Sequence, residues 1–412
     1  MQRTRFFGWT VVGATFVLAT CGWGVGFYGP PIFMHAVVQR TGWPVSWVSA
    51  AVTLHFLCGA LVVANLPRLY RCFGIPIITV LGAALLAIGV LGWASARLPW
   101  QLFTAALFSG FGWAALGAAA VNAIIAPWFI SARPAALGMA YNGASLGGLI
   151  FSPLWVWLIG AFGFVTAAWG VGLLLVAIVS SLATLVFSRT PEQLGQHVDG
   201  GGADTSTRRA ASAAMSLPGN LLFMSRRFLT LATGMSLGLF AQIGLIAHLF
   251  SLLAPRLGEQ WAGWAMGLAT LCAIIGRTLV GWLLKPNTDR RLVAGMGYAT
   301  QLGGSIVLML AGDHLVLVWL GVVLFGSGIG NSTSLPPLIA QVEFTSEDAR
   351  RAVPMIVAIS QASYAFAPVM FGLLRESTGP PMNSSMLFFA VVALVQAVAM
   401  FCFMRGRKLK NR

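Results

Sequence analysis

Acidic residues are missing from almost half of this chain. No Asp or Glu precedes Glu192, although six long apolar runs lie before it. The ten acidic residues of the 412-residue chain all lie in loops or near the ends of apolar runs. One cation, Arg277, instead lies deep inside an apolar run. Charges in such runs are rare and usually functional, so the interior is expected to handle a negative or neutral molecule rather than a cation.

Paired cysteines and catalytic motifs are also missing. The chain has no CxxC or Cys/His spacing, so we expect neither a disulfide framework nor a metal site. No Ser/His/Asp set, P-loop or dinucleotide fingerprint lies in a suitable context. These absences predict a protein that is not an enzyme and has no cofactor. The five cysteines are Cys21, Cys58, Cys72, Cys272 and Cys402.

Charge is scarce overall, and apolar residues dominate. Residues are 58% hydrophobic and 8% charged, which excludes a soluble globule. Runs long enough to cross a hydrocarbon core of about 30 Å recur along the chain, and backbone in lipid must be helical. The first run is too long for a signal peptide and has no cleavage pattern after it. We therefore expect an all-α membrane protein with twelve transmembrane helices, near 8–35, 44–66, 74–95, 99–128, 135–159, 163–187, 228–253, 261–284, 292–312, 315–341, 352–374 and 385–404.

The net charge of +15 follows from topology and does not indicate a nucleic-acid partner. If the N-terminus is inside, 20 of the 25 Lys and Arg residues fall in cytoplasmic segments. This positive-inside bias predicts a multi-pass protein of the inner (cytoplasmic) membrane with both termini in the cytoplasm. Its expected surroundings are the lipid bilayer, and its expected state is a monomer.

A polar stretch divides the chain. Residues 188–226 have the Gly, Ser and Arg composition of a flexible linker, between a six-helix bundle at 1–187 and another at 227–412. The two halves show a weak similarity in sequence, with Pro153 in the fifth span and Pro368 in the matching place of the eleventh. Proline bends a helix, and two similar halves with bendable helices suit an alternating-access transporter.

Four stretches carry a resemblance to a known family. They are Gly8-Trp9, the segment from Trp128 to Pro153, Gly276-Arg277 followed by Gly281, and the segment from Gly328 to Pro337. With the twelve spans, they resemble the major facilitator superfamily and, within it, the bacterial monocarboxylate-transporter-like branch. The resemblance implies the major facilitator fold and transport of a monocarboxylate.

The chain departs from this family pattern in three places. The loop Arg71-Cys72-Phe73-Gly74 lacks the usual Asp of an Asp-Arg pair. Pro31 and Ala273 occupy the positions of a Lys and an Asp that take part in proton coupling in animal relatives. The eleventh span lacks the Lys of oxalate–formate exchangers. Of the charged groups that the family uses, Arg277 remains.

Arg277 is the first candidate for binding substrate. A guanidinium group pairs bidentately with a carboxylate, which suits an organic anion. The alternative is an arginine tied to backbone carbonyl groups of a neighbouring helix.

Two histidines are candidates for carrying a coupled proton. His55 lies midway along the second span and His248 near the outer end of the seventh. Imidazole titrates near neutrality, so either could substitute for a missing carboxylate. Both could instead be structural hydrogen-bonding residues.

Further polar residues in the spans could contact substrate or could merely bond a neighbouring helix. These candidates are Tyr28, Asn122, Asn331, Gln361 and Tyr364, with Gln242, the wall residue Trp113 and Asn142, an amide expected to be buried like Asn122, as additions.

The sequence therefore predicts a secondary active transporter that moves a small organic anion, a monocarboxylate, by alternating access with proton symport or anion exchange. One alternative is an exporter of neutral or amphipathic molecules on the same fold. A second is a receptor or sensor that does not transport and is built on a transporter scaffold.

Overall fold

The computed structural model describes residues 6–201, 219–284, 288–377 and 381–407, and these contain helices and no strands. The Cα positions divide the chain into two compact units. Unit 1 comprises Met1–Trp43 and Leu54–Arg209, and unit 2 comprises Pro44–Thr53 and Ala210–Arg412. Each unit is described by itself.

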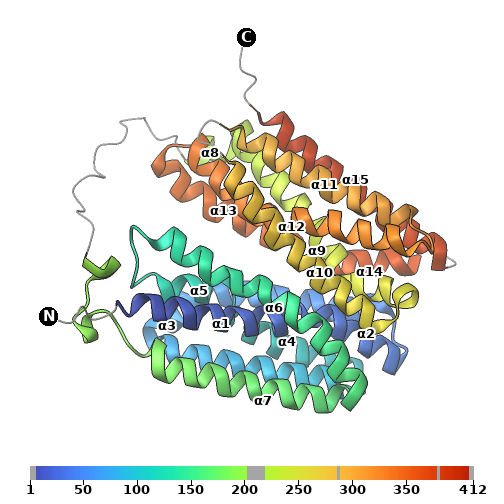
Figure 1. The fold of residues 1–412 in the computed structure, drawn as a ribbon, viewed down its shortest axis with the longest axis horizontal. Coiled ribbons are helices and arrows are strands. Elements are labelled where there is room, and N and C mark those ends of the chain that lie inside the picture. Colours follow the sequence, from blue (N-terminus) through green and yellow to red (C-terminus); the bar gives the residue numbers. More distant parts are fainter. Residues whose placement is uncertain (1–5, 202–218, 285–287, 378–380, 408–412) are drawn as a thin grey trace, which may run out of the picture. The chain divides into compact units, whose positions relative to one another are not determined.

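Unit 1 is a bundle in which α1 and α6 run side by side (Figure 1). Its elements are α1 (Gly8–Gly26), α2 (Gly29–Thr41), α3 (Val45–Ser95, whose first residues belong to unit 2), α4 (Pro99–Leu116), α5 (Ala118–Ile125), α6 (Arg133–Phe162), α7 (Phe164–Leu182), the π-helical turn η1 (Ala183–Phe187), and the 3-10 turns η2 (Glu192–Leu194) and η3 (Val198–Gly201).

Two of the expected spans are merged in α3. With 51 residues it would measure about 75 Å if straight, more than twice the thickness of a hydrocarbon core. Gly74 interrupts it with φ 81° and ψ 157°, a conformation that a side chain disfavours. We expected a loop before Gly74, but helical backbone reaches it. The two expected spans are thus present, joined by one non-helical residue.

Small residues bring the helices of unit 1 close together. A Cβ atom at Gly147 of α6 would meet the carbonyl oxygen of Thr20 in α1 at 2.5 Å, and one at Gly112 of α4 would collide with the backbone of α3 at Leu86. Apolar burial gives little drive for association in lipid, so such close backbone contacts hold the bundle together.

Unit 2 is built around α9, which packs against α10, α12, α13, α14 and α15. A core of buried residues from α9, α11, α12, α13 and α15 fills it, including Leu231, Tyr298 and Phe403. Its helices are α8 (Gly219–Met224), α9 (Arg226–Leu257), α10 (Glu259–Leu283), α11 (Arg290–Leu310), α12 (Leu315–Glu343), α13 (Ser346–Ala365), α14 (Ala367–Ser377) and α15 (Pro381–Arg405).

The start of α3 pairs with α14 inside unit 2. The backbone N–H of Ser46 donates to Glu376 Oε1 at 2.7 Å, so a carboxylate caps the first turn of α3. The backbone N–H of Val369 donates to Thr53 Oγ1 at 3.1 Å. Between these bonds, Gly372 packs directly on a serine of α3. Two helix segments therefore meet in antiparallel register along a face of small and polar residues.

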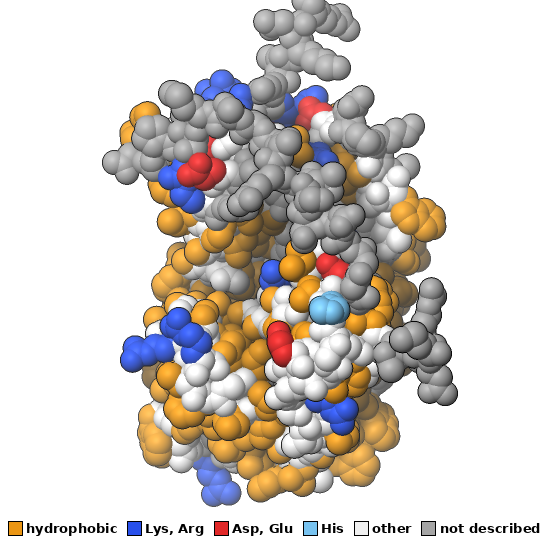
Figure 2. Space-filling view, turned by 90° about the vertical axis from the view of Figure 1, so that its left-hand side faces the viewer, with side chains coloured by type: hydrophobic (Ala, Val, Ile, Leu, Met, Phe, Trp, Pro, Cys, Tyr) orange, Lys and Arg blue, Asp and Glu red, His pale blue; other side chains and the backbone are white. Residues whose placement is uncertain are grey.

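The chain is a multi-pass membrane protein. In the described part, 11 helical segments are long and apolar enough to cross a membrane, with α3 counted once. Large apolar side chains such as Leu61, Trp282 and Val316 are more than 60% exposed. Hydrophobic side chains cover much of the face in Figure 2, between scattered charged residues. Apolar exposure on this scale fits a surface that faces lipid.

The beginning of the expected linker docks on unit 1. Asp199 in η3 accepts hydrogen bonds from the backbone N–H groups of Ile130, Ser131 and Ala132, just before α6. Gln196 Oε1 accepts from the backbone N–H of Phe7 at 2.9 Å. Burial opposes ionisation of Asp199, but the bonds from Ser131 and its neighbours outweigh it, so the pKa lies below the ordinary value. The carboxylate thus stays ionised and bonded near neutral pH.

Candidate functional site

In unit 1, the expected amide Asn122 pairs with a residue that we did not predict, Tyr141. Asn122 Nδ2 donates to the Tyr141 hydroxyl at 2.6 Å and to the Ala118 carbonyl at 2.9 Å. The hydroxyl of Tyr141 donates to the same carbonyl at 3.1 Å. This half-buried group lies beside Gly117, where the helix of the fourth span breaks into α4 and α5. Interrupted helices are where transporters commonly bind their substrates.

A chain of aromatic contacts links this pair to Tyr28, at the break between α1 and α2. Tyr28 contacts Phe27 with ring centroids 5.0 Å apart, and Phe27 contacts Trp113 at 6.1 Å. Trp113 meets Trp23 at 4.9 Å, and Trp23 meets Tyr141 at 6.2 Å. All five rings are half-buried. Unit 1 therefore brings Tyr28 and Asn122 into one continuous set of aromatic and neutral polar side chains, with Trp113 at its centre.

His55 borders the same region of unit 1 and is fully buried. Its Nε2 lies 2.9 Å from the carbonyl oxygen of Gly26, the last residue of α1. Its Nδ1 lies 2.9 Å from Ser109 Oγ on α4. The imidazole thus joins three helices, one of which ends at the α1–α2 break.

In unit 2, Arg277 of α10 is half-buried and reaches α12. Its Nε–H donates to the Gly330 carbonyl at 3.1 Å, and the Ser334 hydroxyl donates to the same oxygen at 3.0 Å. The alternative we considered, an arginine bonded to a carbonyl group of a neighbouring helix, is thus present in part. This bond uses one of five N–H donors and fixes the direction of the guanidinium group.

The remaining expected residues of unit 2 lie on different faces. Asn331 is buried on α12, and its Cβ faces Gly297 of α11. Gln361 and Tyr364 lie one turn apart on α13, both half-buried, and the Tyr364 ring packs on the core of unit 2.

The two added amides have opposite environments. Asn142 is exposed, so the expectation that it is buried was wrong; its neighbour Tyr141 faces the bundle instead. Gln242 is buried and accepts from Gln301 Nε2 at 3.2 Å.

His248 on α9 meets a second cation, Arg375 of α14. Its Nε2 lies 2.9 Å from the Pro368 carbonyl, and its Nδ1 lies 3.2 Å from Arg375 Nη1. Arg375 Nη1 also donates to Ser251 Oγ at 2.7 Å. The imidazole is completely buried. These bonds brace α14 against α9.

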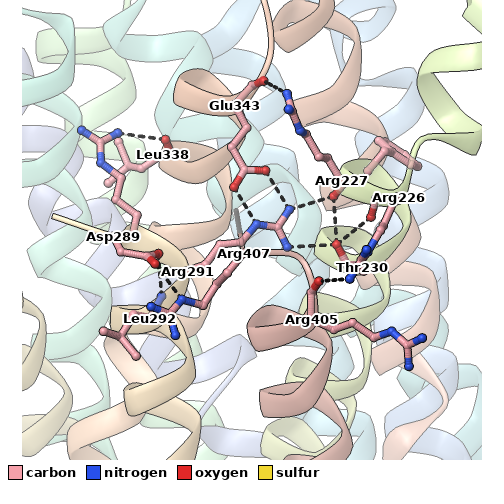
Figure 3. Close-up of polar contacts among 12 residues, drawn as sticks. Arg226, Arg227, Thr230, Asp289, Arg291, Leu292, Leu338, Glu343, Arg405 and Arg407 are labelled. Atoms are coloured by element: carbon pink, nitrogen blue, oxygen red, sulfur yellow. Dashed lines mark hydrogen bonds and ion pairs between the residues drawn. The ribbon is translucent and has the colours of Figure 1, made fainter. Parts of the chain in front are cut away.

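A third arginine of unit 2 is buried in a network that was not predicted (Figure 3). Arg291 is 2% exposed and pairs bidentately with Glu343, at 2.6 Å and 2.8 Å. It also donates to Thr230 Oγ1 and the Arg227 carbonyl, both at 2.9 Å. Arg226 donates to the carbonyl of the last residue of α15 at 2.7 Å. The network ties together the ends of α9, α11, α12 and α15 and serves their packing.

Metal ligands are not grouped in the described residues: no three His, Cys, Asp or Glu side chains come together as a set that could hold an ion.

The sequence model of the Major Facilitator Superfamily matches residues 11–368. The fold is similar to the crystal structure of the nucleoside transporter NupG, with a TM-score of 0.73 over 100% of both chains and 14% sequence identity. A bacterial homolog of the human lysosomal transporter Spinster, in its inward-facing and unoccupied conformation, gives 0.69 over 99% of this chain and 100% of that chain, also at 14% identity. Curated proteins gave no match. At such identities, the structural likeness concerns the fold alone.

Proposed function

The chain belongs to the major facilitator superfamily, and from that premise we propose that it is a secondary active transporter of a small organic anion, a monocarboxylate. It moves this cargo by alternating access across the inner (cytoplasmic) membrane as a monomer with both termini in the cytoplasm. A proton is carried in the same direction.

Arg277 is the observation that carries this proposal. It lies within a membrane-spanning helix, where a charged side chain costs about 3 kcal/mol on insertion scales. The bond from Nε–H to the Gly330 carbonyl orients the guanidinium group. A carboxylate would neutralise it and would form two parallel hydrogen bonds.

Within unit 1, the aromatic set offers surfaces that suit the organic part of a transported molecule. Trp23, Phe27 and Trp113 offer ring faces and edges, while Asn122 and Tyr141 offer neutral hydrogen-bonding groups. None of these five residues carries a charge.

The same aromatic set favours a second candidate, transport or export of neutral or amphipathic molecules. NupG is named as a nucleoside transporter, so this fold accommodates neutral aromatic cargo. The identity of 14% carries no substrate to this chain, and the neutral candidate leaves Arg277 without a role in binding. We therefore rank it second.

Uptake by proteoliposomes tests the proposal. Radiolabelled acetate, lactate, pyruvate, benzoate and uridine are supplied to wild type, Arg277→Ala and Arg68→Ala, with and without an inward proton gradient. Arg68 is an exposed arginine of α3 and controls for the loss of one positive charge. We expect carboxylate uptake that Arg277→Ala lowers about 30-fold or more, because losing a charged partner costs about 2 kcal/mol or more.

Two results would contradict the anion proposal. One is carboxylate uptake by Arg277→Ala that equals that of wild type. The other is uptake of uridine with no uptake of any carboxylate, which would favour the neutral candidate.

A further inference from the structure

The hydrogen bonds of His55 define its tautomer. A carbonyl oxygen only accepts, so Nε2 carries a hydrogen and donates to Gly26. In the neutral ring, Nδ1 is then an acceptor, and its partner is the Ser109 hydroxyl. The neutral state of His55 therefore has both ring nitrogens satisfied.

Ser109 allows the same site to hold the protonated ring. Its Oγ lies 3.2 Å from the Ala106 carbonyl, which is a second acceptor for the hydroxyl hydrogen. Trp93 Nε1–H donates to the same oxygen at 3.2 Å. If Nδ1 gains a proton, the hydroxyl turns to Ala106 and accepts from both His55 and Trp93. Every donor and acceptor in the group remains paired, so only a rotation of one O–H bond is required.

The hydrogen-bond partners of His248, in contrast, disfavour the protonated ring. Its Nε2–H donates to the Pro368 carbonyl, so its Nδ1 must accept from the Arg375 guanidinium. A proton on Nδ1 would destroy this bond and place two N–H donors and two positive charges against each other. The arginine therefore keeps His248 neutral, and the histidine serves as a brace between α9 and α14.

No charge opposes a proton on His55. From α1 it meets the Gly26 carbonyl, from α4 the Ser109 hydroxyl, and through that hydroxyl the indole of Trp93. The neighbouring ring of Phe56 on its own helix is apolar. Among the described residues, no charged side chain has a contact with the imidazole. The groups that meet His248 from α14, by contrast, are the Pro368 carbonyl and the charged guanidinium group of Arg375.

From this contrast we propose that His55, and not His248, binds the co-transported proton, at Nδ1, with Ser109 as the pivot of the hydrogen-bond exchange. The inference rests on the proposed symport and names the group that performs it. A proton enters on Nδ1 from the side of uptake and leaves from the same atom to the other side. Protonation strengthens the bond from Nε2 to Gly26, so the bound proton acts on the residue at which α1 ends.

The test compares substrate exchange with proton-driven uptake in proteoliposomes that contain a pH-sensitive dye. The probe is radiolabelled lactate, pyruvate or benzoate, whichever wild type accumulates. Glutamine replaces each histidine in turn, because its amide can donate and accept at similar positions. We expect His55→Gln to keep exchange within about twofold and to lose gradient-stimulated uptake and dye-reported proton entry by about tenfold or more. His248→Gln, the matched control, should keep both.

Ser109→Ala supplies a second readout if His55→Gln does not fold. It removes the acceptor of the protonated ring but leaves the bond from Nε2 to Gly26. The pH of half-maximal uptake should fall by about one unit, a tenfold weaker proton affinity. A purely structural role of Ser109 would not shift this pH profile.

Several outcomes would overturn the inference. Wild-type gradient stimulation in His55→Gln, an unchanged pH profile in Ser109→Ala, or loss of stimulation in His248→Gln alone would each do so. Carboxylate uptake by wild type without gradient stimulation would remove the proton and leave the role of Arg277 standing. Absence of carboxylate uptake would remove the proposed function, and this inference with it.

Discussion

At the scale of single residues, Arg277 owes its position to the missing side chain at Gly330. A Cβ atom there would collide with the Ala273 carbonyl and would lie 3.1 Å from Arg277 Nε. The close crossing of α10 and α12 and the bond to the guanidinium group therefore depend on the same glycine.

We predict that Gly330→Ala destabilises the protein by about 1–3 kcal/mol, because overpacking forces two backbones apart. Like Arg277→Ala, this variant should also show weaker uptake. Thermal unfolding in detergent and uptake assays measure both effects. The matched control is Gly281→Ala on α10, where a Cβ would meet nothing within 4 Å. Equal melting temperatures for the two variants would show that the α10–α12 crossing tolerates the methyl group.

Single residues also show what the sequence can predict. Arg277 stood out because a lone cation in an apolar run is easily recognised. Arg375 did not, since its place near the end of a run resembled that of a solvent-facing residue. Asn142 and Tyr141 are neighbours about 100° apart on a helix, and nothing in an almost uniformly apolar helix indicates which one faces inward. Partners such as Ser109 and Trp93 depend on helix packing, which a single sequence does not specify.

At the scale of elements, the ends of four helices in unit 2 depend on one buried ion pair. Arg291 and Glu343 come from α11 and α12, and the arginine also holds the first turn of α9. Removing one partner of a buried pair leaves the other charge without compensation.

We predict that Glu343→Gln lowers the free energy of unfolding by about 3–5 kcal/mol. The control is Arg407→Gln, which breaks the partly exposed pair between Arg407 and Asp289 and should cost about 1 kcal/mol or less. Chemical or thermal unfolding of the purified protein compares them. Similar losses in the two variants would mean that Glu343 is not the principal partner of Arg291.

The elements themselves were largely predictable, but their interruptions were not. The apolar runs indicated the spans because lipid requires helical backbone. Gly117 divides the fourth span, and Phe366 divides the eleventh just before Pro368. The sequence showed glycine and proline there, but these residues also occur in spans that continue without a break. Pro153, for example, lies inside α6, which is helical on both sides of it.

At the scale of the whole molecule, the asymmetry of Lys and Arg predicts which ends of the helices face the cytoplasm. Cys72 is suited to test this, because it is exposed two residues before Gly74, whereas Cys21, Cys58 and Cys272 are buried and Cys402 is half-buried.

We predict that a membrane-impermeant maleimide labels Cys72 in inverted membrane vesicles and not in right-side-out vesicles. A cysteine introduced as Arg97→Cys, between α3 and α4, should show the opposite pattern. Labelling of both positions from the same side would refute the predicted topology.

The distance in sequence between α9 and its neighbour α15 has a consequence for biosynthesis. Of the candidate spans in the described part of the chain, α9 is the most enclosed, with 83% of its apolar stretch buried. Its neighbour α15 is made later, and the bond from Arg226 to Arg405 joins residues 179 apart in the chain. At 5–20 residues per second the ribosome needs about 9–36 s to make this interval. During that time α9, with Gln242 and His248 in the membrane, lacks α15 as a neighbour. A chain that stalls there would be a natural substrate for membrane quality-control proteases.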